Sequence, residues 1–354
     1  MKRVISTVVV VCLSILFLTS CEKEIPSEKK IITGHDYIIY EDTIYYIDRY
    51  TQKIRYQILG NIQETGLPLI GDALAMDDDN PFSRINSAMM LVDEAATKAN
   101  EGQPILIFAL KSADEENYQI LSYNTKDSRL SVLKEDITGP VQTLHLYGEY
   151  ILYTTNDGEL GCNVHSLKKD GSTCYTLPNP EHQIYIVKNC YNDEIYIESS
   201  LSLYKASMTM ENLTFLFDNY DTPVFFSEKY LYYREYDSRQ LCRRTLADLS
   251  QNEVFLEEKT VGITRGNSYL YLKEAKDSGG FGKEEYDMVY LYNASTDENR
   301  LIFQNTEPDV MYFYMDFSDQ YILFECNYIS GDKVGVKEFM VYNIETQEKL
   351  YIPY

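Results

Sequence analysis

The chain has 354 residues, and its 55 acidic residues outnumber its 32 Lys and Arg, for a formal net charge of −23. Hydrophobic residues make up 44%, enough for a folded core, which excludes wholesale disorder. The acidic balance argues against nucleic-acid binding and against electrostatic attraction to an anionic membrane surface. The 33 Tyr and 14 Phe indicate β structure, because aromatic residues favour strands.

Residues 1–20 have the features of a secretory signal peptide. A positive start, Met1-Lys2-Arg3, precedes an apolar run from Val4 to Leu18. This run is shorter than the roughly 20 apolar residues that a membrane-spanning helix needs. It ends in Leu18-Thr19-Ser20-Cys21, which resembles the lipobox of bacterial lipoproteins.

The lipobox resemblance implies that a diacylglyceryl group is attached to the Cys21 thiol and that cleavage occurs just before this residue. An ordinary secreted protein with an incidental Cys is the alternative. Residues 21–30 are mainly charged, Pro and Ser, and we expect a flexible tether there. Residues 31–354 would then be held by the lipid on the extracytoplasmic face of the cell membrane.

A strand–turn–strand unit recurs along residues 31–354. Its clearest copy comprises Tyr150–Gly158, Asn163–Ser172 and Cys174–Leu177. Equivalent apolar positions lie 43, 36, 39 and 52 residues apart, at Leu152, Ile195, Leu231, Leu270 and Ile322. Blades of β-propellers repeat at about 40 to 50 residues with four strands each. The sequence therefore predicts an all-β protein, a β-propeller of seven four-stranded blades, with six or eight blades or a β-sandwich as alternatives.

Short apolar stretches precede most copies and are expected to form the innermost strand of each blade: Val141–Leu146, Gln183–Val187, Pro223–Phe226, Val261–Thr264 and Val310–Tyr314. The last strand, Lys349–Tyr354, should pair within its own blade, while the segment from Ile31 to Tyr40 helps to close the ring. Within the sixth blade, the Gly-containing segment Asp277–Lys283 is expected to form a flexible loop.

Residues 60–102 interrupt the repeat and are treated as an insertion with one short helix. Asn80-Pro81 has the residue types of a helix start, and Gly102 those of a helix end. Four apolar residues in between follow helical spacing: Ile85, Met89, Val92 and Ala96. In the competing interpretation, Ala88–Val92 is the innermost strand of the second blade.

The repeated Tyr-Ile/Leu-Tyr-Tyr strands followed by polar turns resemble a known group of proteins. They are similar to bacterial extracytoplasmic propellers related to the YWTD-type low-density-lipoprotein-receptor propellers and to the TolB-like propellers. The similarity is sharpest at Lys169-Asp170-Gly171-Ser172 and at Tyr232-Tyr233-Arg234, although the chain lacks the Trp of the receptor motif. This resemblance implies the fold more than a function.

No residues form a recognisable catalytic or metal-binding motif. The four histidines, His35, His145, His165 and His182, lack metal-ligand spacing, and His145 is expected to pack within or on a blade. The acidic run Asp77-Asp78-Asp79-Asn80 lacks the spacing of an EF-hand and is expected to be a solvated loop. Paired carboxylates for glycoside chemistry stay open as an alternative, with no pair to select. We expect no cofactor and no bound metal.

The chain has seven cysteines, and their number bears on whether it contains disulfides. Cys12 belongs to the signal peptide and Cys21 to the lipid site, which leaves an odd number: Cys162, Cys174, Cys190, Cys242 and Cys326. At least one thiol is thus unpaired. A turn near Lys169-Asp170 places Cys162 opposite about residue 178, so a bridge between Cys162 and Cys174 is not expected.

The tyrosines have two interpretations. Most should fill the space between blades, whereas a cluster at a propeller mouth could stack on sugar rings or grip a peptide. Together these features favour a non-catalytic, lipid-anchored module that binds a protein, peptide or glycan. An envelope propeller enzyme acting on glycans or other extracellular substrates is the alternative.

Overall fold

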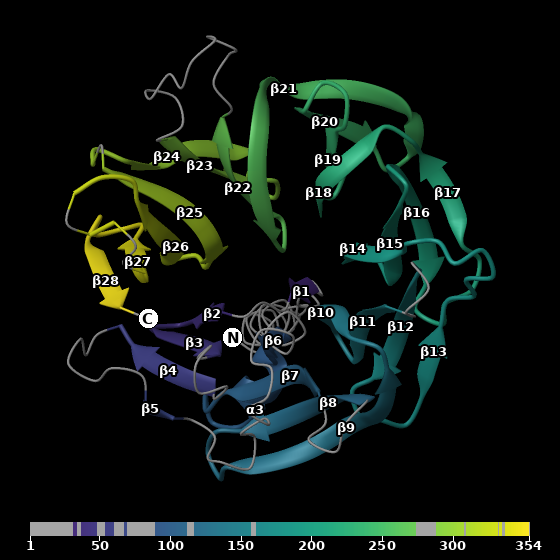
Figure 1. Ribbon diagram of the computed structural model, residues 1–354. Coiled ribbons are helices and arrows are strands. Elements are labelled where there is room, and N and C mark those ends of the chain that lie inside the picture. Colours follow the sequence, from purple (N-terminus) through teal and green to yellow (C-terminus); the bar gives the residue numbers. More distant parts are fainter. Residues whose placement is uncertain are drawn as a thin grey trace, which may run out of the picture.

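The computed structural model describes residues 31–33, 37–47, 54–59, 67–68, 89–111, 117–156, 161–273, 288–307, 309–331, 333–334 and 337–353. Within these ranges the chain forms a ring of seven blades around a central channel (Figure 1). Each blade is an antiparallel sheet of four strands that follow one another along the chain. The predicted seven-bladed β-propeller is therefore confirmed.

The strands are assigned to blades in chain order. Blade 1 contains β2 (Tyr37–Tyr40), β3 (Thr43–Ile47), β4 (Ile54–Ile58) and β5 (Leu67–Pro68). Blade 2 contains β6 (Met89–Val92), β7 (Ile105–Lys111), β8 (Asn117–Asn124) and β9 (Arg129–Thr138). Blade 3 contains β10 (Val141–Tyr147), β11 (Tyr150–Asn156), β12 (Cys162–Lys168) and β13 (Cys174–Thr176). Blade 4 contains β14 (Ile186–Tyr191), β15 (Glu194–Ser199), β16 (Ser202–Ser207) and β17 (Thr214–Phe217).

Blades 5 and 6 share one long strand. Blade 5 contains β18 (Tyr220–Phe226), β19 (Tyr230–Glu235), β20 (Gln240–Thr245) and the first part of β21 (Asp248–Arg265). The second part of β21 is the innermost strand of blade 6, with β22 (Ser268–Lys273), β23 (Met288–Asn293) and β24 (Glu298–Gln304). Blade 7 contains β25 (Val310–Phe317), β26 (Tyr321–Tyr328), β27 (Lys337–Asn343) and β28 (Lys349–Pro353).

The expected innermost strands occur at four of the five predicted places. The exception is Gln183–Val187, because β14 begins only at Ile186. The Gln183 backbone N–H instead donates to the Asn179 side-chain oxygen at 2.9 Å, which holds the preceding residues in a turn. The five apolar residues that the repeat predicts to be equivalent are all on second strands and have no exposed surface.

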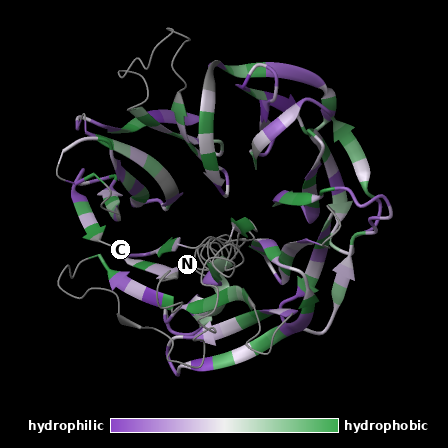
Figure 2. Ribbon diagram, viewed as in Figure 1, coloured by the Kyte–Doolittle hydropathy of each residue, from purple (hydrophilic) through white to green (hydrophobic). Residues whose placement is uncertain are grey.

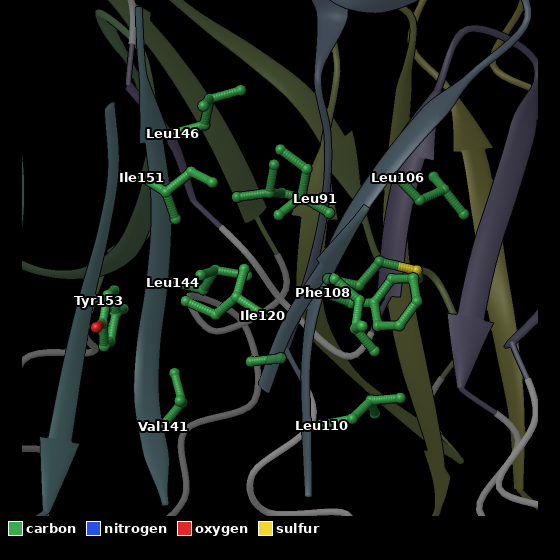
Figure 3. Close-up of a cluster of buried hydrophobic side chains, with 14 of the residues drawn as sticks. Leu91, Leu106, Phe108, Leu110, Ile120, Val141, Leu144, Leu146, Ile151 and Tyr153 are labelled. Atoms are coloured by element: carbon green, nitrogen blue, oxygen red, sulfur yellow. The ribbon is translucent and has the colours of Figure 1, made fainter. Parts of the chain in front are cut away.

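The core consists of layers between adjacent blades. Figure 3 shows the layer between blades 2 and 3, where Leu91, Phe108 and Ile120 face Leu144 and Ile151. Alternate residues along each strand turn towards one or the other neighbouring blade, so the hydropathy changes from residue to residue (Figure 2). Every blade is thus buried on both faces by its neighbours.

A short additional strand, β1 (Ile31–Thr33), lies at the centre of the ring (Figure 1). It pairs antiparallel with β10, with Ile31 opposite Tyr147 and Thr33 opposite His145. It also lies close to the innermost strands β6, β14 and β21 of three other blades. β1 therefore extends blade 3 into the channel rather than completing blade 1.

Among the described residues, the ring closes between blades 7 and 1 without exchange of strands. β28 pairs with β27 of its own blade, as predicted. Apolar side chains from both blades form the junction, among them Tyr37, Ile39, Leu323 and Phe339. The prediction that the whole segment from Ile31 to Tyr40 closes the ring is wrong for β1, because the inner edge of β10 offers unpaired backbone groups that β1 satisfies.

The predicted helix across Met89 and Val92 is wrong, and the competing strand interpretation is confirmed. Met89–Val92 forms β6, which pairs with Ala109–Leu106 of β7. A helix, α3 (Glu94–Ala99), begins directly afterwards, with Asp93 as its N-cap. Pairing with a buried strand outweighs helical spacing in an apolar run of this length. The expected helix start at Asn80 lies outside the described residues, as do the acidic run and the Gly-containing loop.

The two open faces of the ring carry different connections. We call "entry face" the one with the hairpins between the first and second strands of the blades, since Ile31 lies at that end of β10. The helix α3 belongs to this face, in the connection between β6 and β7. The "far face" carries the connections between second and third strands and those between successive blades. No helix among the described residues is long and apolar enough to cross a bilayer.

Candidate functional site: the mouth of the channel on the far face

A hollow of about 420 Å³ lies on the far face between blades 5 and 6. It is lined by Asp221, Arg234, Val261 and the turn between β19 and β20, which contributes Tyr236, Asp237 and Arg239. Innermost strands begin at this face, so Asp221 at the start of β18 and Val261 near the start of the blade 6 strand lie beside the channel. The hollow therefore lies at the far mouth of the channel.

The walls of the hollow are held by a charged pair. Arg234 donates to Asp221 Oδ2 from Nε at 3.1 Å and from Nη2 at 2.7 Å. Its Nη1 donates to the Thr260 carbonyl at 2.7 Å, which joins blade 5 to blade 6. Arg239 lies on the rim with a positive φ of 57°, and its carbonyl accepts from the Thr260 N–H at 3.2 Å. Such an arrangement presents fixed polar groups next to apolar surface, which is typical of ligand sites.

Exposed apolar side chains also occur along the channel and on the connections of the far face. Three belong to innermost strands, where Val261 is 38% exposed and Met311 and Phe313 are each 46% exposed. Five others belong to far-face connections: Ile184, Leu201, Tyr236, Ile329 and Val334. The remaining large apolar residues that are exposed lie on outermost strands: Leu130, Val132, Phe215, Val254 and Leu301. None of the described connections of the entry face carries one.

Two of the described histidines, His145 and His165, serve packing, whereas His182 is exposed. His145 is 3% exposed, and its Nδ1 lies 3.1 Å from the Thr33 hydroxyl, which ties β10 to β1. The prediction that His145 packs within a blade is confirmed. His165 stacks on Tyr153 with ring centroids 4.6 Å apart, and its two nitrogens lie 2.9 Å from the hydroxyls of Thr155 and Thr176. Burial lowers the pKa of His165 to about 4, so its imidazole is neutral at physiological pH.

The five described cysteines are all free thiols. Cys174 pairs with Leu167, and the Asn179 amide donates to the Cys162 carbonyl at 3.2 Å, so the expected register of this hairpin is confirmed. Burial raises the pKa of Cys242 to about 11 and that of Cys326 to about 12. Thiols with such raised pKa values remain protonated and are poor nucleophiles.

The described part of the chain contains no group of three His, Cys, Asp or Glu side chains arranged to hold a metal ion. Cys21, the predicted lipid site, and His35 lie outside it, and so does the run Asp77 to Asn80. The sequence named Arg234 and Val261 only as parts of repeat strands and gave no reason to place them in a site. One feature of the sequence could have indicated this site: Tyr236-Asp237 forms a turn directly after a strand. An aromatic residue in a turn has no neighbouring strand to cover it.

Comparisons with known proteins support the fold alone. No protein-family model matches the chain, and no curated protein matches it in sequence. The β-propeller domain of the Trilobed protease from Pyrococcus furiosus, described as having an open velcro topology, is similar in structure with a TM-score of 0.50. The alignment covers 92% of this chain and 99% of that one, at 9% sequence identity.

A second similar structure is the acylaminoacyl peptidase from Pyrococcus horikoshii, with a TM-score of 0.51 and 10% identity. The alignment covers 91% of this chain and 52% of the peptidase, so this chain spans about half of its length. At this level of identity, the likeness concerns the ring of blades.

Proposed function

We propose that this protein is a lipid-anchored, extracytoplasmic propeller that binds a protein, peptide or glycan at its far mouth without chemically changing it. The observation that carries the proposal is the polar hollow on the far face, where the exposed side chains of Tyr236 and Val261 lie beside fixed charged groups. Apolar surface next to a few fixed polar groups is typical of binding sites. Tyr236, 49% exposed on the rim, offers a ring for stacking and a hydroxyl for hydrogen bonding.

The anchor is proposed from the sequence, where the lipobox-like Leu18-Thr19-Ser20-Cys21 follows an apolar run. Metabolic labelling with a fatty-acid analogue should mark the natural chain and leave Cys21→Ala unmarked. Cys174→Ala, which removes an exposed thiol of blade 3, is the matched control and should label like the natural chain. Equal labelling of Cys21→Ala would refute lipidation at this residue.

The binding site is tested with two double variants of the chain from residue 22. Tyr236→Ala with Phe313→Ala removes two exposed rings at the far mouth, and Phe215→Ala with Leu301→Ala removes similar exposed area from outermost strands. We expect the affinity for a partner captured from envelope extract, or for a ligand found on glycan or peptide arrays, to fall at least about tenfold in the mouth variant only. Loss of central anchor residues of an interface has effects of this size. Equal loss in both variants would refute a site at the mouth.

The enzyme alternative has its own outcome in the same experiment. The protein is incubated with chromogenic glycoside, ester and peptide substrates beside a heat-denatured sample. Turnover well above that of the denatured sample would replace the binding function with catalysis.

Because the net charge is −23, a basic partner would associate less tightly as salt screens the charges.

A further inference from the structure

The direction of β1 determines at which face of the ring this strand begins. Ile31 lies opposite Tyr147, the last residue of β10, and Thr33 lies opposite His145, further inside the strand. β1 therefore begins at the entry face and runs into the channel. Ile31 is 6% exposed and packs with Tyr147 and Leu152, so the start of β1 is fixed to the core of blades 3 and 4.

The length of chain before β1 limits where an anchor can be. From Cys21 to Ile31 there are ten Cα steps, which span at most about 35 Å when fully extended. A folded domain of residues 31–354 has a radius of gyration of about 20 Å, so its rim lies about 25 Å from the axis. An innermost strand of six or seven residues adds about 20 Å in height. A path over the rim to the far face therefore exceeds the reach of the tether.

A path back through the channel is also unfavourable. Residues 22–30 contain six charged side chains, all of which would have to enter a channel already occupied by β1. Burying a charge without a partner costs several kcal/mol or more. The charged tether is expected to stay in water on the side where β1 begins.

From these constraints we infer that the lipid anchor keeps the far mouth of the propeller from facing the bilayer, so that the membrane lies on the side of the entry face or of the rim. The inference rests on the proposed lipidation of Cys21. The far mouth is thereby the surface presented to partners in the space beyond the membrane, and its apolar side chains are not a membrane-insertion surface. A short tether attached near the ring axis gives the domain this fixed sidedness.

The side chains of the entry face agree with a surface that stays outside the bilayer. Its described connections expose many carboxylates: Glu41, Asp42, Glu101, Asp127, Glu149, Asp170, Asp193, Glu211, Glu228, Asp297, Asp319, Glu345 and Glu348. Exposed lysines there are few: Lys98, Lys126 and Lys229. Anionic headgroups would repel this face, so the lipid, and not the protein surface, would hold the domain at the membrane.

The test attaches the protein to vesicles in vitro and so does not depend on lipidation in cells. Residues 21–354 with Cys162→Ser and Cys174→Ser are coupled through Cys21 to a maleimide lipid in phosphatidylcholine vesicles. A donor dye is introduced through an azido side chain at Glu228 on the entry face or at Tyr236 on the far face. Lipids with a dye on the headgroup serve as acceptors. The donor and acceptor dyes are chosen to have a short Förster distance.

We expect at least twofold higher energy transfer from the Glu228 position than from the Tyr236 position. A spacer of twenty Gly and Ser residues between Lys30 and Ile31 should bring the two values together, because the longer tether lets the ring turn over. Equal transfer with the natural tether, or higher transfer from Tyr236, would overturn the inferred sidedness. If cellular labelling fails while energy transfer remains higher from the Glu228 position, the lipidation proposal is wrong but the inferred sidedness of the tether is retained.

Discussion

At the level of single residues, tyrosine is the main packing residue between blades. Tyr292 is almost fully buried; its hydroxyl donates to Asp297 at 2.9 Å and lies 3.0 Å from the Tyr232 hydroxyl. Tyr269, also buried, donates to the Thr260 hydroxyl at 3.0 Å. A phenol ring fills the space between two sheets while its hydroxyl finds a polar partner, which avoids the cost of an unsatisfied buried group. This explains why strands so rich in Tyr form buried layers.

His165 makes the stability of the protein depend on pH. Its pKa of about 4 in the folded chain lies below the ordinary value of 6.5, so the unfolded chain binds a proton first as the pH falls. The free energy of unfolding should therefore decrease between about pH 6.5 and pH 4, by roughly 1.4 kcal/mol per pH unit at most. Urea unfolding at pH 7.5 and 4.5 measures this loss.

The substitution His165→Gln isolates this contribution from that of the many carboxylates. The variant should lose about 2 kcal/mol less stability on acidification than the natural chain. His182→Gln, which changes an exposed histidine, should behave like the natural chain. Identical pH dependence of the natural chain and His165→Gln would contradict the prediction.

At the level of elements, the short helix α3 ties two blades together through its N-cap. One oxygen of Asp93 accepts from the Ala96 N–H at 3.0 Å, and the other lies 2.8 Å from Lys169 Nζ of blade 3. The Asp93 side chain is 3% exposed, so this ion pair is shielded from water. A six-residue helix is not stable by itself, and these contacts hold it on the entry face.

Removing the Asp93 carboxylate should destabilise this junction. Asp93→Ala loses the cap and leaves Lys169 without its buried partner, for an expected loss of about 2 to 4 kcal/mol of unfolding free energy. Asp93→Asn keeps an acceptor for the cap and should retain part of the stability and the amide protection of residues 94–99. Glu101→Ala removes a carboxylate that is 79% exposed and should change stability by less than about 0.5 kcal/mol.

At the level of the whole molecule, the ring depends on side-chain contacts at one junction because, in the described part of the chain, no strand is exchanged between blades 7 and 1. Arg265, at the end of β21, donates from Nη1 to the Phe317 carbonyl at 2.6 Å and lies 3.5 Å from Asp316 Oδ2. The same Asp316 oxygen accepts from the Ile39 N–H at 3.2 Å. Arg265 thus connects blade 6 to both sides of the closure.

Arg265→Ala should open this junction more readily than any other single change of a surface-accessible arginine. It leaves the buried Phe317 carbonyl and the Asp316 carboxylate without their cationic partner, which should cost about 2 to 4 kcal/mol. Differential scanning calorimetry and amide exchange of β2 and β25 provide the measurements. Arg300→Ala, on an exposed part of β24, is the control and should stay within about 0.5 kcal/mol. Equal effects of the two variants would show that Arg265 does not hold the closure.

The sequence by itself predicted a propeller of seven blades, with six or eight as alternatives, and most of the strands, because the alternation of apolar residues and the polar turns are local properties of each repeat. It left Met89–Val92 undecided between strand and helix, since only the neighbouring strand β7 decides the pairing of so short an apolar run. The place of β1 in the channel was not predictable either, because it depends on the unpaired inner edge of β10, more than a hundred residues away.

The candidate site was decided by the tertiary structure alone. Tyr236, Val261 and Phe313 look like the buried aromatic and aliphatic residues of any other strand or turn in this sequence. They differ only in that the curvature of the ring leaves them uncovered at one mouth of the channel. Burial is a property of the assembled blades, so a local pattern specifies which residues are apolar, and only the closed ring specifies which of them remain exposed for a partner.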